Sequence, residues 1–344
     1  MIRRIALPAA VALAAVLSLG SSAVSAGGPT VHGSWAPVAP LPSAAAIMTV
    51  TGGPGGRVFA FGFCLGTCHQ LGGDVSYGQS VTYVYSPSDG AWHKGTPAPD
   101  ICSGAQASSV IPGGVIRLGG CWTDLVTDPG FRVADYNIAT KTWTMEPGYG
   151  PYVDPIAATQ AANGDTYWYA QTLRHQDLAV FISGDRVVTE NALGTFHSKA
   201  RQPKNGPEDG IGLGSDGVVY VAGGNRECHP DLGACAMPPV EAWVPQLNQW
   251  FRPTVVPTSR IFTAVTADSH GRIFVAGGIA ADGSRIFAKV EVLRPDKGWA
   301  TAPSLPTARF NALATATPDG RVWVIGGYDT FGNPLQDGYV FTPA

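Results

Sequence analysis

The residues best suited to bind a ligand are four arginines that stand next to predicted β-strands. Arg260 and Arg309 open strands, whereas Arg226 and Arg174 follow strands. A guanidinium group forms paired hydrogen bonds with a carboxylate, so these arginines predict an anionic ligand. The alternative is that each arginine pairs with a carboxylate of the chain itself, and both interpretations stay open. Candidate internal partners are Asp177, Glu208, Asp209 and Asp329.

Acid–base chemistry has weaker candidates. Four polar residues on neighbouring predicted loops could form an acid–base or metal cluster, although such residues are typically solvated: His175, Asp177, His229 and Asp231. An enzyme that isomerises a sugar needs an acid and a base at one carbon, for which His175 with Glu208 or Glu227 is the candidate pair. No G-x-S-x-G, H-E-x-x-H or phosphate-binding loop occurs. We therefore predict no catalytic residue, metal or cofactor, leave enzymatic activity open, and complete the predicted ligand-binding set with His175, Trp122 and Tyr328.

Residues 1–26 have the pattern of a secretory signal peptide. Arg3 and Arg4 precede an apolar stretch from Ile5 to Leu19, and the small residues up to Ala26 suit cleavage after that position. The apolar stretch is short for a membrane span, which needs roughly 20 residues. We expect export by the general or the twin-arginine route, no stable membrane insertion after cleavage, and a single mature domain at residues 27–344.

Export changes the interpretation of the six cysteines, because an oxidising compartment favours disulfides over metal sites. Proximity in the sequence favours three pairs: Cys64–Cys68, Cys102–Cys121 and Cys228–Cys235. The middle pair would join the two ends of one predicted hairpin. The alternative, a zinc site made by Cys64, Cys68 and His69, lacks a second pair of ligands nearby.

The composition excludes several classes of protein. A net charge of −3 argues against a nucleic-acid-binding protein, which normally presents a basic face. The chain has 44 glycines and 28 prolines, and 45% of its residues are hydrophobic. These values indicate a turn-rich chain with a substantial core, and they exclude collagen, coiled coils and proteins with several membrane spans.

An internal repeat organises the rest of the sequence. Six segments share a turn followed by a strand, and they begin at Gly56, Gly113, Gly164, Gly217, Gly271 and Gly320. An aromatic residue recurs 49 to 57 residues apart, at Trp35, Trp92, Trp143, Phe196, Trp250 and Trp299. Because both markers have one period of about 50 residues, they predict six copies of one unit. We expect the aromatic residues to pack between neighbouring units.

Each unit is predicted to hold four strands, A to D. The last unit has strands A, B and C at residues 311–317, 321–326 and 337–341, but it has no strand D. Residues 31–37 supply a strand D without strands A to C. Pairing the two pieces closes a ring and removes exposed sheet edges. The sequence therefore predicts an all-β, six-bladed propeller with four-stranded blades, closed by the N-terminal strand.

The repeat resembles that of the Kelch family. The stretch from Leu305 to Gly332 reads LPTARFNALATATPDGRVWVIGGYDTFG, and most units end at a tryptophan. Unit three departs from the pattern, because Tyr169-Ala170-Gln171 stands in place of the double glycine. The resemblance covers nearly all of the mature chain and implies the propeller type also found in galactose oxidase. It does not imply that enzyme's copper site, because our predicted pairing leaves no free cysteine for its tyrosine–cysteine link.

The Kelch resemblance also bears on the arginines. In Kelch propellers that bind acidic peptides, arginines at the start of strand A and after the double glycine contact the ligand. Arg260, Arg309 and Arg226 match these positions, and Arg174 matches loosely. The exported N-acetylneuraminate epimerase, a six-bladed Kelch propeller, supplies the alternative of a sugar mutarotase or epimerase.

One face of the propeller carries the predicted binding surface. The B–C and D–A connections lie on it, with all six cysteines, and the B–C loops are predicted at residues 64–79, 121–130, 171–177, 225–239, 279–285 and 328–336. Binding usually resides on loops of a rigid scaffold. We predict a secreted, monomeric and non-catalytic platform for an anionic carbohydrate or protein ligand.

Overall fold

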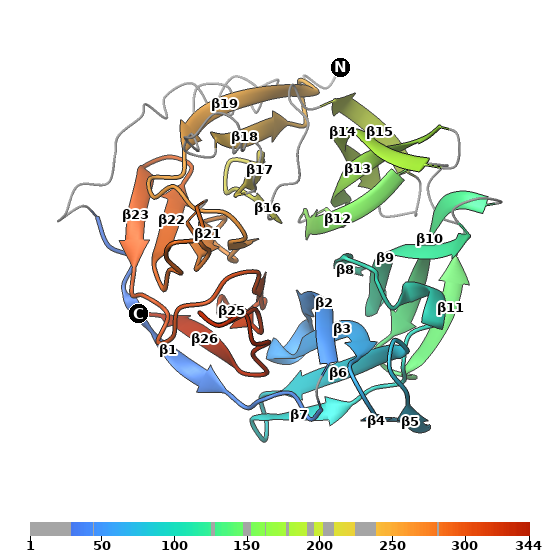
Figure 1. Ribbon diagram of the computed structural model, residues 1–344. Helices are drawn as coiled ribbons and strands as arrows, with labels where there is room; N and C mark the ends of the chain where they lie inside the picture. The colour runs from blue at the N-terminus through green and yellow to red at the C-terminus, as the bar shows by residue number, and fades with distance from the viewer. Residues whose placement is uncertain are drawn as a thin grey trace, which may run out of the picture.

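The computed structural model describes residues 29–43, 45–124, 128–146, 153–161, 163–176, 179–190, 196–201, 210–223, 239–280 and 282–344. Six antiparallel four-stranded sheets stand around a central axis (Figure 1). The protein is therefore a six-bladed β-propeller, as the repeat of about 50 residues predicts.

The first three blades follow one another along the chain. Blade 1 holds β2 (Ala45–Gly52), β3 (Val58–Cys64), β6 (Ser80–Ser86) and β7 (Ala91–Lys94). Blade 2 holds β8 (Ala107–Ile111), β9 (Val115–Asp124), β10 (Asp128–Asn137) and β11 (Thr142–Glu146). Blade 3 holds β12 (Val153–Gln160), β13 (Thr166–Gln176), β14 (Ala179–Glu190) and β15 (Phe196–Arg201).

The last three blades return to the start of the chain. Blade 4 holds β16 (Gly210–Leu213), β17 (Val219–Ala222), β18 (Pro239–Val244) and β19 (Gln249–Val255). Blade 5 holds β20 (Ala264–Ala267), β21 (Ile273–Ala276), β22 (Val290–Arg294) and β23 (Gly298–Ala302). Blade 6 holds β24 (Leu313–Ala316), β25 (Val322–Ile325), β26 (Gly338–Pro343) and, as its outer strand, β1 (Gly33–Val38).

A few short elements lie in the connections. The 3₁₀ helix η1 (Pro54–Gly56) forms the A–B turn of blade 1, and η2 (Asp100–Cys102) precedes blade 2. A small hairpin of β4 (Cys68–Gln70) and β5 (Gly73–Val75) lies in the B–C loop of blade 1. The predicted A–B turns at Gly164, Gly217 and Gly320 all have positive φ, which explains why glycine occupies them.

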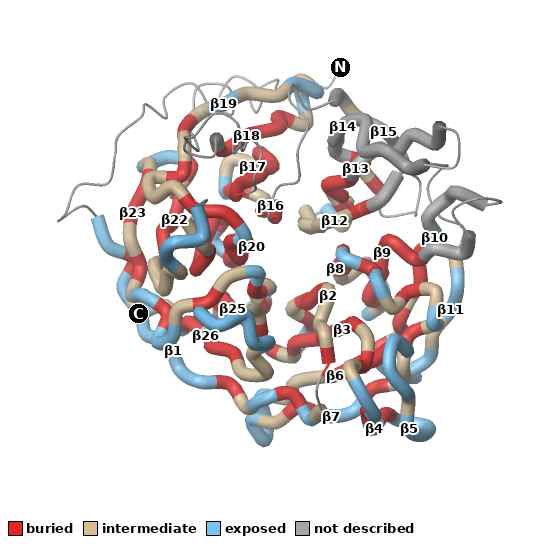
Figure 2. The backbone as a smooth tube through the Cα atoms, viewed as in Figure 1, coloured by how far each residue is buried: buried red, intermediate tan, exposed pale blue. Residues whose placement is uncertain are grey.

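The hydrophobic core is divided among the six interfaces between blades. Each of six buried clusters joins residues of two neighbouring blades. Strand alternation explains the division, because successive side chains point to opposite faces of a blade. On β13, Trp168 packs with blade 2, whereas the next residue, Tyr169, packs with blade 4. Figure 2 shows this burial in each blade.

The repeated tryptophans link neighbouring blades, as predicted. The indole N–H of Trp92 donates to the carbonyl of Ala39, at 2.8 Å, and that of Trp143 donates to the carbonyl of Thr96, at 2.9 Å. Each acceptor follows the outer strand of the preceding blade. Phe196 belongs to β15, but its side chain lies outside the described residues. The tryptophans therefore stabilise the ring at its periphery.

The N-terminal strand closes the ring, also as predicted. β1 pairs with β26 in antiparallel register, with Trp35 opposite Phe341. The Trp35 indole donates to the Pro303 carbonyl of the preceding blade, at 2.7 Å. On the inner side, β24 contacts β2, so the six innermost strands form an unbroken ring around the axis (Figure 1).

Two predicted B–C loops are largely strand. β13 runs to Gln176 and pairs with β14 from Ala179, so most of the predicted loop at residues 171–177 belongs to a hairpin. β9 likewise runs to Asp124, within the predicted loop at residues 121–130. Register shifts, such as the one between Thr172 and Leu173, let these hairpins bend while pairing continues.

Candidate functional site

Arg260 lies inside blade 5, with 0% of its residue surface exposed. Its guanidinium contacts the Glu291 carboxylate at 2.5 Å and donates to the carbonyls of Gly277 and Val275, at 2.7 and 2.9 Å. Glu291 is also fully buried. The side chain therefore connects the segment before β20 to strands β21 and β22 of its own blade.

Arg309 occupies the matching place in blade 6. It is also 0% exposed, and its guanidinium donates to the Gly326 carbonyl at 2.9 Å. It contacts both carboxylate oxygens of Asp337, at 3.2 and 3.3 Å, and lies 4.7 Å from the centre of the Tyr339 ring. This placement matches the intramolecular alternative and leaves neither predicted arginine on a surface that a ligand could reach.

The double glycines make room for this arrangement. Gly277 and Gly278 have φ of +66° and +100°, and a Cβ on Gly277 would lie 2.5 Å from the Arg309 carbonyl oxygen. Only glycine fits such a position without displacing the neighbouring blade. The turn also exposes the carbonyl of Gly277, which accepts the hydrogen bond from Arg260.

Neighbouring groups stabilise the negative charge of Glu291. Burial raises the pKa of this carboxyl, but the nearby Arg260 charge and hydrogen bonds from Lys289 and Thr258 outweigh burial, so its pKa lies below the ordinary value. Glu241 on β18 is buried in the same way and accepts hydrogen bonds from Arg252. A glutamate beside valine in strand C is the sequence signal of these buried partners.

Of the other predicted ligand-binding residues, the structure describes the side chain of Tyr328. Tyr328 lies at the start of the B–C loop of blade 6, half-buried, with its ring 5.6 Å from Phe310. Trp122, Arg174 and His175 belong to β9 and β13 rather than to loops, and their side chains lie outside the described residues. Arg226, Asp177, His229, Asp231 and both proposed glutamate partners of His175 also lie outside.

Two of the three predicted disulfides are formed. Cys64 bonds to Cys68 in the B–C loop of blade 1, and Cys102 in η2 bonds to Cys121 on β9. The first bond excludes the zinc alternative, because it occupies both thiols. Cys228 and Cys235 lie outside the described residues. Disulfides are typical of extracytoplasmic proteins.

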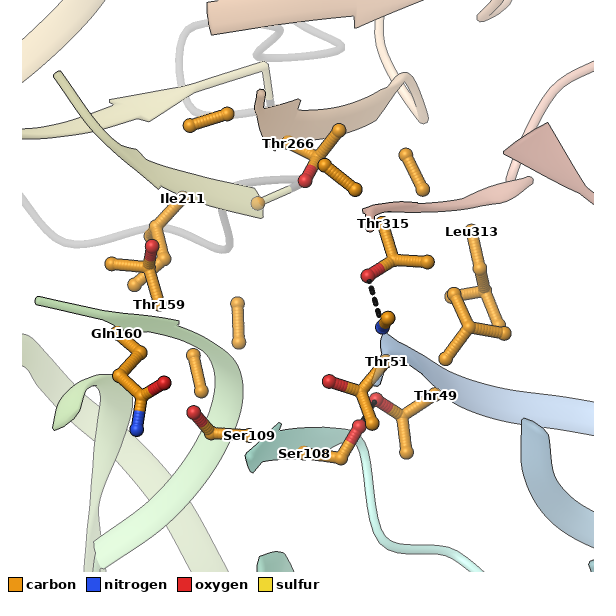
Figure 3. Close-up of a pocket in the computed structure, with 18 of the residues that line it drawn as sticks. Thr49, Thr51, Ser108, Ser109, Thr159, Gln160, Ile211, Thr266, Leu313 and Thr315 are labelled. Carbon is orange, nitrogen blue, oxygen red and sulfur yellow. Dashed lines mark hydrogen bonds between the residues drawn. The ribbon is translucent and has the colours of Figure 1, made fainter. Parts of the chain in front are cut away.

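The central channel of the propeller holds a cavity of about 440 Å³. The innermost strands of all six blades line it, which no single repeat could reveal (Figure 3). At the end toward the D–A connections it is bordered by Gln106, Gly210 and Ala312; at the opposite end it is bordered by the A–B turns at Pro54, Ser269 and Pro318. Ligand sites commonly have volumes of about 300–1,000 Å³.

Uncharged polar groups and apolar side chains share the described wall of this channel. The hydroxyls of Thr51, Ser109, Thr159 and Thr266, with the amide of Gln160, line it in Figure 3. The Thr49 and Ser108 hydroxyls bond to each other at 2.9 Å. Apolar side chains lie among them, chiefly Ile211, Val265 and Leu313. The wall therefore offers both hydrogen bonds and apolar contact.

Among the described residues that line the channel, Asp268 is the single carboxylate. Its side chain is fully buried and contacts the Arg272 guanidinium at 2.5 Å, so its charge is compensated. Within the described ranges, no three His, Cys, Asp or Glu side chains gather closely enough to hold a metal ion. The described lining thus offers no acid–base pair for chemistry on a sugar carbon, and it suits a neutral ligand.

Over the described residues, the protein has no helix that is long and apolar enough to cross a membrane. No protein-family model matches the chain, and no curated protein matches it significantly.

Proposed function

We propose that this protein is an exported, non-catalytic propeller of the Kelch type that binds a neutral, hydroxyl-rich carbohydrate in its central channel. The observation that carries the proposal is the channel wall, where hydroxyl and amide groups from several blades surround a cavity of about 440 Å³. Sugars present hydroxyls around an apolar carbon frame, and they match a wall of this composition. The signal-peptide pattern and the two disulfides support export.

The burial of Arg260 and Arg309 favours a neutral over an anionic ligand. An acidic sugar requires a cation that it can reach, whereas Arg260 is already paired with Glu291, and Arg309 with Asp337. Transferring a carboxylate into a channel whose described wall has no exposed cation costs several kcal/mol. Neutral saccharides avoid this cost.

The proposal is tested by titrating the domain, residues 27–344, with matched neutral and acidic saccharides, followed by NMR. We expect neutral saccharides to bind and acidic ones to bind more weakly. The double variant Thr51→Val and Thr159→Val should raise Kd about tenfold, because each lost hydrogen bond contributes about 0.5–1.5 kcal/mol. Thr342→Val, at an exposed position on β26, is the control and should bind as the wild type does.

Two outcomes would overturn the proposal. The first is that no neutral saccharide binds, or that acidic ligands bind more tightly than neutral ones. The second is an accelerated exchange between the anomers of a bound sugar, which would favour the mutarotase alternative. Unchanged anomeric exchange with saturable binding supports a non-catalytic role.

A further inference from the structure

Phe262 is an exposed aromatic residue in a backbone conformation that such residues avoid. Its φ is +54°, and 41% of its surface is exposed. A bulky side chain at positive φ is a genuine outlier, and such outliers cluster at functional sites. Two other non-glycine residues with positive φ, Lys141 and Asn248, lie in tight C–D turns. Phe262 lies in no hairpin turn, because it precedes the innermost strand of blade 5.

Blade 6 shows which residue the same backbone position would ordinarily take. Asn311 follows Arg309 by two positions, as Phe262 follows Arg260, and its φ is +53°. Asparagine tolerates this conformation because its short polar side chain forms local hydrogen bonds. The repeat therefore has a strain-free residue in blade 6 and a strained, exposed aromatic ring at the equivalent place in blade 5.

The backbone on both sides of Phe262 is fixed. Ile261 pairs with Ile279 through two hydrogen bonds of 2.9 Å. The Phe262 carbonyl accepts a hydrogen bond of 2.8 Å from the Asn311 amide of the next blade. These contacts hold the backbone conformation against its intrinsic cost, so the direction in which the side chain leaves the backbone is fixed.

The backbone of Phe262 lies beside the rim of the channel. Phe262 comes just before β20, which lines the channel, and its bonded neighbour Asn311 directly precedes the channel residue Ala312. The side chain of Asn311 is exposed there, and Gln106 of blade 2 borders the same end. Phe262 and Asn311 thus lie beside the entrance that faces the D–A connections and that Gln106 borders.

We propose that Phe262 is a stacking platform for one pyranose ring at the entrance of the channel, with the Asn311 amide within reach of the sugar's hydroxyls. This inference rests on the proposed function and names the part of the sugar that is recognised, its apolar C–H face. An exposed aromatic ring offers a flat apolar surface that remains solvated until a ligand covers it. Ligand binding then accounts for the strained backbone at Phe262, which folding alone does not require.

The experiment compares Phe262→Asn and Phe262→Trp with the wild type, using methyl pyranosides and short neutral oligosaccharides as probes. Phe262→Asn places the blade 6 residue in blade 5, so it relieves the strain and removes the ring. We expect its Kd to rise at least tenfold while its unfolding midpoint stays equal to or above that of the wild type. Phe262→Trp keeps a stacking surface, and its Kd should remain within about threefold of the wild type.

Contrary results identify which idea fails. A lower midpoint for Phe262→Asn would make the ring a packing residue, and an unchanged Kd would mean that the sugar does not touch it; either result overturns the stacking site while leaving the channel as the binding site. Loss of binding by Phe262→Trp also counts against stacking. If the wild type binds no neutral saccharide, the proposed function itself fails, and the stacking site fails with it.

Discussion

Arg260 stabilises blade 5 through a buried ion pair, and its replacement tests that role at the scale of one residue. We expect Arg260→Gln to lower the free energy of unfolding by about 3–5 kcal/mol, because the buried Glu291 carboxylate loses its compensating charge. Urea and thermal unfolding measure the change. Arg285→Gln, at an exposed position on the same blade, should change stability by less than about 0.5 kcal/mol.

The pH dependence of this difference is an independent readout of the same pair. The lowered pKa of Glu291 means that its stabilising contribution is present above about pH 4.5, the ordinary value, and is lost as the pH falls through the lower pKa of the folded state. The gap in stability between wild type and Arg260→Gln should therefore shrink on acidification from pH 7 to pH 3. A gap that stays constant, or a variant that unfolds like the wild type but no longer binds ligand, would contradict the structural role.

The sequence predicts where these arginines lie but not which way they point. The repeat predicts Arg260 and Arg309 at the start of strand A, and they lie four residues before the innermost strands β20 and β24. Their burial depends on carboxylates from strand C, such as Glu291, which is distant in the sequence. The sequence also does not predict the strain at Phe262, because the residue type does not fix the φ angle of the backbone.

At the scale of elements, the two disulfides differ in the length of chain that they close. Cys102 and Cys121 are 19 residues apart, whereas Cys64 and Cys68 are 4 apart. In the chain-entropy account the longer loop contributes about 3 kcal/mol and the shorter loop about 2 kcal/mol. We therefore expect the double variant Cys102→Ala and Cys121→Ala to unfold at a lower urea concentration than Cys64→Ala and Cys68→Ala.

The matched control for the disulfide variants is the wild type with both bonds intact, unfolded in the same buffer. Equal losses in the two variants, or a larger loss for Cys64→Ala and Cys68→Ala, would show that packing outweighs loop closure. All four sulfurs belong to buried residues, so both variants also remove core atoms and the comparison between them cancels much of that cost.

Element boundaries were predicted well where turn chemistry marks them. Gly164, Gly217 and Gly320 placed the A–B turns correctly, because positive φ demands such residues. The B–C connections of blades 2 and 3 have no such marker, and pairing simply continues from β13 into β14 as far as Gln176 and Ala179. A strand without a terminating turn residue can extend as long as its partner does.

At the scale of the whole molecule, stability and the candidate site have the same origin. Each core cluster lies between two blades, so no blade holds a complete core of its own. The channel likewise exists only when all six innermost strands surround the axis. Closure of the ring is therefore required for the core and, under the proposed function, for ligand binding.

The N-terminal segment makes that closure, and its removal is the test at this scale. Residues 29–31 bond to Thr301 on the outer strand of blade 5, and β1 then covers β26 of blade 6. A chain that starts at residue 39 should expose both sheet edges and the buried Phe341, so we expect a lower melting temperature and aggregation. A chain that starts at residue 27 is the control and should stay monodisperse.

Adding a synthetic peptide of residues 27–38 to the shortened chain should restore its melting temperature and saccharide binding, because the peptide supplies the missing strand in trans. Unchanged melting and solubility of the shortened chain would contradict closure by this strand, since the ring would then be held by the remaining contacts between blades 6 and 1.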